Sequence, residues 1–381
     1  MKKQIAQIIF ICLMTAFGCN GPSKEHNRDN LNTETQQETT IAPGNALDIQ
    51  FNYLNKAVQK KDTHVWGSSP VVGHDGKTHL YVAEWPVPTD HAEGFSGWFK
   101  HSQIAHYVGD TPKGPFKFLR IAVQDRDGVF NAPHNPTIQF VDDKYVLCFI
   151  VNENDDLKKQ RIVMYVSDSL NDDWKPAAGA KQDGTILAKP DHAAIWNYNP
   201  RLGVSNPSLI KLNDTYMLYY KSVIPDSIDR DDRSKWDYGY GVATSDRLEG
   251  PYTLYPHRVT AEGLQLEDAY AFTYSDKVYM LSRDFNGSLG SHGGGLLWKS
   301  DDGLYFSKES VLRAFDGLEA YVGKETTKNA AVYRGNNEGH LERPQLLMID
   351  GVPQFMYVAT GINDAEGYGS CSHVFEVVLH E

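Results

Sequence analysis

Short apolar segments alternate with polar turns along most of the chain. Residues 205–222, SNPSLIKLNDTYMLYYKS, contain an apolar run, an Asn-Asp turn and an aromatic run. Two such runs joined by a turn of this kind predict a β-hairpin. Four other segments repeat the pattern. Each begins with two residues, mostly polar or charged, and in three of the four segments proline follows them. They are SSPVVGHDGKTHLYVAE from Ser68, HNPTIQFVDDKYVLCFIV from His134, EDAYAFTYSDKVYMLSRD from Glu267 and ERPQLLMIDGVPQFMYVATG from Glu342.

A second set of hairpins lies between the first. Residues 102–120, 161–176, 240–256 and 295–310 each combine a strand, a polar turn and an aromatic residue. Four strands per unit and five units predict an all-β fold, a five-bladed β-propeller. The last unit lacks a strand after VFEVVLHE, and residues 46–60 are the expected donor, although LDIQFNYLNKAVQKK also suits a helix. A pair of β-sandwiches is the competing fold, and it leaves the five matched hairpins unexplained.

The repeated tripeptides predict a shared pocket. In a propeller, the innermost strand of each blade lines the central channel, so five strand starts converge at one mouth. Proline at the first residue of a strand removes no ladder hydrogen bond, and it restricts the backbone of the residue before it. The residues expected to face the pocket stand before Pro or, in the fourth unit, before Ala269. They are Ser69, Asn135, Asn206, Asp268 and Arg343.

Composition agrees with this fold and limits the classes of molecule that the protein is expected to bind. The chain of 381 residues contains 21 Tyr, 16 Phe and 7 Trp, with 32 Gly and 18 Pro for turns, a balance typical of β-proteins. The net charge is −12 and no block of Lys or Arg is present, so we expect no nucleic-acid partner. Cys148, inside YVLCFIV, is expected in the core. The sequence allows a Cys148–Cys371 disulfide as well as two separate thiols.

The N-terminus has the pattern of a lipoprotein signal. Lys2 and Lys3 precede an apolar stretch that is too short to span a bilayer comfortably, and it ends in TAFGC, with Cys19 at the lipidation position. We therefore expect a signal peptide at residues 1–18, a flexible tether at 19–45 and one propeller domain at 46–381. The predicted location is the cell envelope, with a lipid anchor as the only membrane contact. A plain secretory signal is the alternative.

The organisation of residues 60–381 resembles the five-bladed propeller glycosidases, glycoside hydrolase family 43 and its relatives. The resemblance rests on the hairpins and on the S-D-x-x-x-G-P-(F/Y) pattern of the outer strands. It implies a carbohydrate pocket, with an Asp base, an Asp that tunes the acid and a Glu acid on the first three blades. Here those positions read Ser69, Asn135 and Asn206. The lipobox also resembles that of surface-anchored enzymes in Bacteroidetes polysaccharide-utilisation systems.

The acids stand instead in the later units. Glu267, Asp268 and Glu342 are the candidate catalytic carboxylates, and His134 and His292 are candidate proton-transfer groups. Arg343 is suited to bind a carboxylate or sulfate in two-point fashion. The spacing of the histidines carries no metal-ligand signature, and no cofactor or metal is expected. The remaining candidate substrate-binding residues are Asn135, Asn206, Ser69, Trp66, His101 and Lys221.

Three functions fit these residues. In the first, the chain removes water from a terminal uronic acid of an anionic oligosaccharide, with amides and His134 where hydrolases have acids. Dehydratases of this kind act in ulvan breakdown, and the chain resembles one in this respect. In the second, rearranged carboxylates hydrolyse a terminal glycosidic bond. In the third, the chain is a surface glycan-binding lipoprotein without activity. The missing acids favour elimination.

Overall fold

The computed structural model divides the chain into two units, Met1–Asn45 and Ala46–Glu381. It describes residues 47–380 with gaps at 88–93, 172–173, 225–235, 264–265, 286, 288, 290–292, 328–338 and 361–368. The predicted signal peptide, the tether, Cys19 and His292 lie outside the described residues. Within these residues, no helix has the length and hydrophobicity needed to cross a membrane.

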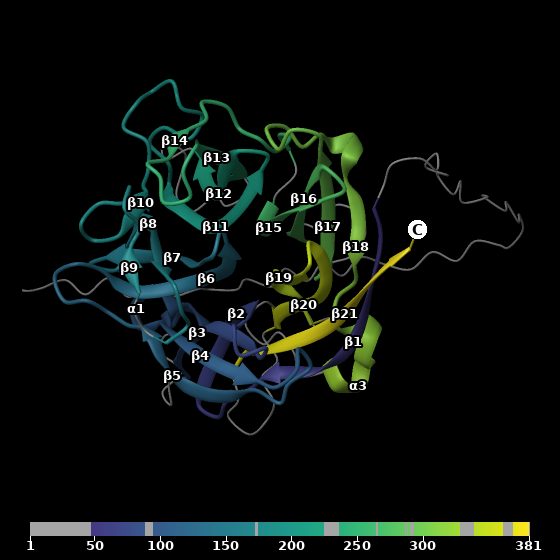
Figure 1. Ribbon diagram of the computed structural model, residues 1–381. Helices are drawn as coiled ribbons and strands as arrows, with labels where there is room; N and C mark the ends of the chain where they lie inside the picture. The colour runs from purple at the N-terminus through teal and green to yellow at the C-terminus, as the bar shows by residue number, and fades with distance from the viewer. Residues whose placement is uncertain are drawn as a thin grey trace, which may run out of the picture. The chain divides into compact units, whose positions relative to one another are not determined.

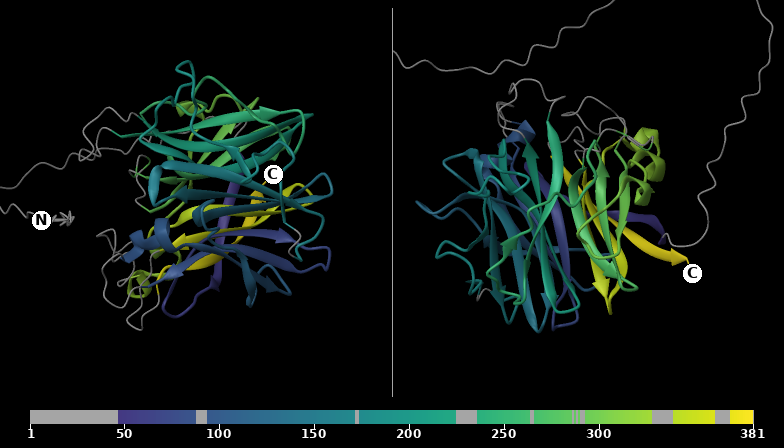
Figure 2. Two further views of the ribbon diagram at one scale, coloured as in Figure 1. Left: turned by 90° about the vertical axis from the view of Figure 1, so that its left-hand side faces the viewer. Right: turned by 90° about the horizontal axis from the view of Figure 1, so that it is seen from above.

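Five antiparallel sheets surround a central channel and form a five-bladed β-propeller, as predicted (Figure 1). Strands β2, β6, β11, β15 and β19 are the innermost of each sheet, and the views of Figure 2 show strands running between hairpin turns at the two ends of the ring. Blade 1 contains β2 (Thr63–Val72), β3 (Thr78–Pro86), β4 (Gln103–Gly109) and β5 (Lys117–Val123). Blade 2 contains β6 (Asn131–Val141), β7 (Lys144–Glu153), β8 (Asp156–Ser167), β9 (Lys175–Pro176) and β10 (Thr185–Leu187).

The remaining blades repeat this order. Blade 3 contains β11 (Leu202–Leu212), β12 (Thr215–Ile224), β13 (Asp237–Ser245) and β14 (Thr253–Leu254). Blade 4 contains β15 (Leu266–Tyr274), β16 (Lys277–Asp284), β17 (Gly295–Ser300) and β18 (Leu312–Phe315). Blade 5 contains β19 (Glu342–Ile349), β20 (Val352–Thr360), β21 (Cys371–His380) and β1 (Asp48–Val58). The short helices are η1 (Gly94–Gly97), α1 (Trp98–His101), η3 (Lys308–Ser310), α2 (Glu319–Val322) and α3 (Lys324–Thr327).

Strand β1 closes the ring. It pairs antiparallel with β21, from Asp48 opposite His380 to Val58 opposite Ser372. The expected donor strand within residues 46–60 is therefore confirmed, and the helical alternative is wrong for this segment. Joining the first strand of the domain to the last blade ties the two ends of the ring together.

Hydrophobic contacts between neighbouring blades form the core. Five clusters of buried side chains lie at the five blade interfaces, so most strands bury both of their faces. This explains why a strand such as β7 reads as a continuous apolar run rather than an alternating one. Cys148 is buried in it, as predicted, and the structure shows no disulfide between Cys148 and Cys371.

Turn chemistry follows the sequence closely, with one difference in blade 4. Residue pairs with positive φ occupy the inner hairpin turns, as in Asp142–Asp143 and Ser275–Asp276, which is the geometry of tight hairpins. The fourth outer hairpin, however, does not form within 295–310. Phe306 pairs with Val259 and Ala261 of the preceding blade region, and the outer strand β18 begins only at Leu312.

Candidate functional site

The same β-bulge recurs in every innermost strand. At each bulge two residues stand opposite one residue of the neighbouring strand. The first bulge residue has a left-handed backbone, which Gly, Asn and Asp adopt most readily. The five first bulge residues are Gly67, Asn135, Asn206, Asp268 and Arg343. The bulge redirects the strand, so the residue before it faces the cavity at one mouth of the channel. These preceding residues are Trp66, His134, Ser205, Glu267 and Glu342.

The bulge corrects the alignment of blade 1. The sequence placed Ser69 beside Asn135, but Gly67 is the equivalent residue, and Ser69 stands two positions further along β2. The Ser69 hydroxyl donates to Gln345 Oε1 at 3.1 Å and accepts from the Ile138 amide at 2.9 Å. Ser69 therefore links three innermost strands and does not line the cavity. Proline misled the alignment because Pro70 lies beyond the bulge of blade 1.

The cavity has a volume of about 140 Å³ and two unlike walls. Its aromatic side comes from blades 1 and 2 and from the η1–α1 segment. Its polar side comes from blades 3, 4 and 5. The volume is below the usual range of drug-sized ligand pockets, so the cavity suits one small ring. The aromatic side includes Trp66, Phe95, Trp98 and His134, and the polar side includes Ser205, Asn206, Lys221, Glu267, Asp268 and Glu342.

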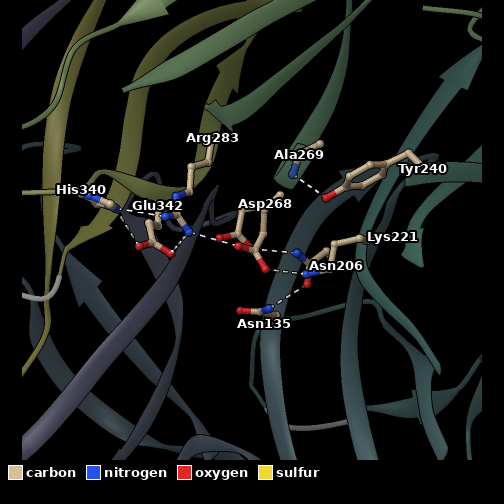
Figure 3. A network of polar contacts seen from close by, with 10 residues as sticks. Asn135, Asn206, Lys221, Tyr240, Asp268, Ala269, Arg283, His340 and Glu342 are labelled. Atoms are coloured by element: carbon tan, nitrogen blue, oxygen red, sulfur yellow. Dashed lines mark hydrogen bonds and ion pairs between the residues drawn. The ribbon is translucent and has the colours of Figure 1, made fainter. Parts of the chain in front are cut away.

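Three carboxylates meet on the polar wall. One oxygen each of Glu267, Asp268 and Glu342 lies within 4.8 Å of the others. Arg283 Nη1 donates to Glu267 Oε2 at 3.1 Å and to Glu342 Oε2 at 2.9 Å, and Lys221 Nζ donates to Glu267 Oε1 at 2.9 Å (Figure 3). Buried acids need such partners, because an unpaired buried charge is strongly destabilising.

Among the described residues, these three acids lie close enough together to share a metal ion. Carboxylate oxygens suit a hard cation. Here Arg283 and Lys221 already bind both Glu267 oxygens and one Glu342 oxygen. This donor set fits an internal network of ion pairs better than a cation site.

Asp268 is the acid most perturbed by its surroundings. Burial, followed by the neighbouring Glu267 charge, raises its pKa to about 6, although Lys221 and Arg343 act in the opposite direction. The Asn206 amide donates to Asp268 Oδ1 at 2.7 Å, and the Asn135 amide donates to Asn206 Oδ1 at 2.9 Å. Asp268 is thus placed to exchange a proton near neutral pH.

His134 lies on the aromatic wall. Its ring stacks on Trp98 with centroids 4.7 Å apart, and its Nδ1 lies 2.9 Å from the Ser102 hydroxyl. Burial, with a smaller contribution from Arg343, lowers the His134 pKa to about 3. The imidazole is therefore neutral near pH 7 and is suited to hydrogen bonding more than to accepting a proton.

Arg343 does not act as the expected clamp. Its side chain is fully buried beneath the cavity, where Nη2 donates to the Asn135 carbonyl at 3.2 Å and to Thr137 Oγ1 at 3.0 Å. It passes close to Gly67, where a Cβ would lie 3.1 Å from Arg343 Cγ. Arg343 therefore ties blade 5 to blade 2. His101, another expected contact, is exposed at the end of α1 and is not among the residues that line the cavity.

The other predicted residues have mixed outcomes. Trp66, Asn135, Asn206 and Lys221 line the cavity with the three acids and His134. Next to His292, Gly293 packs on the backbone of His340, where a Cβ at Gly293 would lie 3.0 Å from His340 Cα.

Sequence reasoning missed Arg283. Lys221 pairs in register with Ser205, and Arg283 pairs in register with Glu267, so the two cations occupy equivalent places one blade apart. Comparing the ends of the second strands, YYKS and LSRD, would have found it. Tyr238 and Trp98 were also missed, since no repeat marks them.

Comparisons with known proteins show the fold. No family model matches the sequence, and no curated protein matches it. Among solved structures, a family 117 glycoside hydrolase from the marine bacterium Zobellia galactanivorans matches with 13% identity and a TM-score of 0.58, over 87% of this chain and 90% of that one. A glycoside hydrolase described within the family 130 mannoside phosphorylases, which targets β-1,2 mannosidic linkages in Candida mannan, matches with 14% identity and a TM-score of 0.55, over 87% and 95%.

A family 43 β-xylosidase/α-arabinofuranosidase from a compost microbial metagenome, solved with xylotriose, is a third similar structure. It matches with 14% identity and a TM-score of 0.52, over 87% of this chain and 94% of that one. Identities this low establish a shared fold alone, because one fold hosts many activities. The chain has the five-bladed propeller architecture of these glycoside hydrolases.

Proposed function

We propose that this protein is a carbohydrate-active enzyme that removes water from the terminal uronic acid of an oligosaccharide. The observation that carries the proposal is the one-sided placement of the acids. All three carboxylates that line the cavity come from blades 4 and 5 and lie within 4.8 Å of one another. The wall opposite offers Trp66, Trp98 and a neutral His134.

One-sided acids suit elimination better than hydrolysis. Hydrolysis of a glycoside ordinarily needs two carboxylates that flank the scissile bond, about 6.5–9.5 Å apart for inversion and about 5–5.5 Å for retention. A syn elimination needs its base and its acid on one face of the sugar, together with positive charge near the developing anion. The polar wall supplies both.

The cavity supports binding of one terminal sugar. Its volume of about 140 Å³ leaves room for a single ring, and Trp66 offers an apolar face for it. Lys221 lines the same cavity and is placed to neutralise a uronate carboxylate, the role predicted for Arg343 from the sequence. The similar structures carry glycoside hydrolase names, and one of them holds xylotriose, which favours an oligosaccharide as substrate.

The reaction balances with two residues. Glu342 accepts the proton on C5, and the electron pair of that C–H bond forms the C4=C5 double bond. The C4–O bond breaks, and the oxygen leaves as water with the proton of Asp268. We assign Glu342 as the base, and the two oxygens of Glu267 hold Lys221 and Arg283 beside it. Asp268 is suited as acid because its pKa is about 6.

The test is incubation with oligosaccharides that end in uronic acids, those of ulvan included. We expect loss of one water by mass spectrometry and rising ultraviolet absorbance from the unsaturated uronate. Gain of water with chain shortening would establish glycoside hydrolysis, the second candidate, which the fold similarity favours. Binding to glycans without turnover of any of them would show that the protein is a glycan-binding protein and not an enzyme.

We also propose that the chain is held at the cell envelope by a lipid on Cys19. The support is the TAFGC pattern after an apolar stretch. Cells fed a labelled fatty acid should incorporate it into the protein and not into the Cys19→Ser variant. Incorporation in neither form would leave a plain secretory signal.

A further inference from the structure

We propose that Arg283 is a positioning residue that holds the carboxylates of Glu267 and Glu342 side by side. The kinetic readout of this inference rests on the proposed function, whereas the titration readout described below does not. The sequence pattern assigns Arg283 no role.

The contacts of Arg283 define a clamp. One guanidinium nitrogen, Nη1, donates to Glu267 Oε2 at 3.1 Å and to Glu342 Oε2 at 2.9 Å. The other, Nη2, lies 3.0 Å from His340 Nδ1. The two acids come from different blades, so a single cation joins β15 to β19 through side chains alone. Figure 3 shows the guanidinium between His340 and the acids.

The surroundings hold the clamp in one place. The Arg283 side chain is 2% exposed, and its guanidinium lies 4.8 Å from the centre of the Phe285 ring. A desolvated cation over an aromatic face is stabilised by the ring quadrupole. Lys221, at the equivalent register position one blade earlier, lies 5.7 Å from the centre of the Tyr238 ring. Each cation of the polar wall therefore has an aromatic ring behind it.

Charge explains why the position needs arginine. Two carboxylates that share a site repel each other, and without a cation one of them retains its proton to higher pH. The planar fork of arginine reaches several acceptors at once, whereas lysine is a point charge. A base must be ionised to accept a proton, so loss of Arg283 should remove activity first at low pH.

The experiment compares Arg283→Gln and Arg283→Lys with the wild-type full chain. The matched control is Arg161→Gln, since Arg161 also forms a largely buried ion pair, with Asp183 at 3.3 Å, in blade 2. Glutamate carboxylates labelled with ¹³C are titrated by NMR, and Glu267→Gln and Glu342→Gln assign the two resonances. Melting temperatures check that each variant is folded.

We expect at least one of the two assigned resonances in Arg283→Gln to titrate at higher pH than in the wild type, with a smaller change in Arg283→Lys and none in the control. Turnover number should fall about 10- to 100-fold with little change in KM, and the acid limb of the pH profile should move to higher pH. Unchanged titration in a folded Arg283→Gln variant would overturn the proposal. A shifted titration in a protein without turnover would instead overturn the proposed function and leave the clamp standing.

Discussion

The two walls of the cavity use the same backbone and opposite chemistry. On the aromatic wall, the residues before the bulges are Trp66 and His134, and the neighbouring strand places Ala83 and Ile150 beside them. On the polar wall, Glu267 stands in the same place, with Arg283 beside it. The repeated β-bulge thus fixes the direction of the side chain before it, and the sequence of each blade determines whether that side chain is aromatic or charged. Under the proposed function, the aromatic wall binds the sugar ring and the polar wall transfers protons.

The largest expected effect comes from removing the base of the polar wall. Glu342→Gln should lower turnover roughly 100- to 10,000-fold, because a positioned proton acceptor contributes that much. Calorimetry should show that oligosaccharide affinity is nearly retained. Glu376→Gln, which changes a half-buried acid of β21 far from the cavity lining, is the control and should keep full activity. Full turnover in Glu342→Gln would remove this residue from the mechanism.

A change on the aromatic wall should act on binding instead. Trp66→Leu removes the flat face for the sugar and should raise KM about 10- to 100-fold, the range expected for lost apolar contacts in a pocket, with turnover at saturation largely kept. Steady-state kinetics over a wide substrate range separates the two parameters. A fall in turnover number at constant KM would mean that the walls do not divide the work in this way.

Asp268 should give the polar wall a pH dependence that the aromatic wall lacks. Burial raises the Asp268 pKa to about 6, so its proton is available below that pH and lost above it. Activity should therefore decline as the pH rises through about 6. The raised pKa also makes its contribution to stability complete below the unfolded-state value and lost as the pH rises through about 6.

Asp268→Asn tests both consequences, because an amide keeps an acceptor for Asn206 and cannot titrate. The melting temperature of the wild type should drop between pH 4 and pH 7 relative to that of the variant. Parallel melting curves for the two proteins would show that Asp268 does not titrate in this range. Since the mechanism also uses this residue, the variant should lose turnover at every pH.

The smallest effect concerns the type of bulge that occurs in both walls, here the bulge at Gly67 in blade 1. Gly67→Ala should destabilise the fold by more than about 1–2 kcal/mol, the cost of a left-handed backbone for a residue with a Cβ, because the new Cβ also meets Arg343. Gly76→Ala is the matched control, since Gly76 has a positive φ but nothing within 4 Å of its Cβ position. Equal losses of unfolding free energy in the two variants would mean that the Arg343 side chain moves away from the new Cβ at no cost in stability.

Local patterns in the sequence determined the architecture. Apolar runs and turn residues are properties of neighbouring positions, so the hairpins, the five blades and the closing strand β1 could be predicted without knowing the fold. The shift of acids to Glu267, Asp268 and Glu342 was visible for the same reason, because the repeats could be aligned.

Tertiary structure decided the rest of the candidate site. A bulge adds one residue to a strand, so the position of Pro70 could not reveal that Gly67, and not Ser69, is equivalent to Asn135. Arginine side chains are long enough to reach another blade, so sequence position did not show that Arg343 binds blade 2 while Arg283 joins the acids of blades 4 and 5. Burial, which lowers the His134 pKa and raises that of Asp268, exists only once five blades close around the channel.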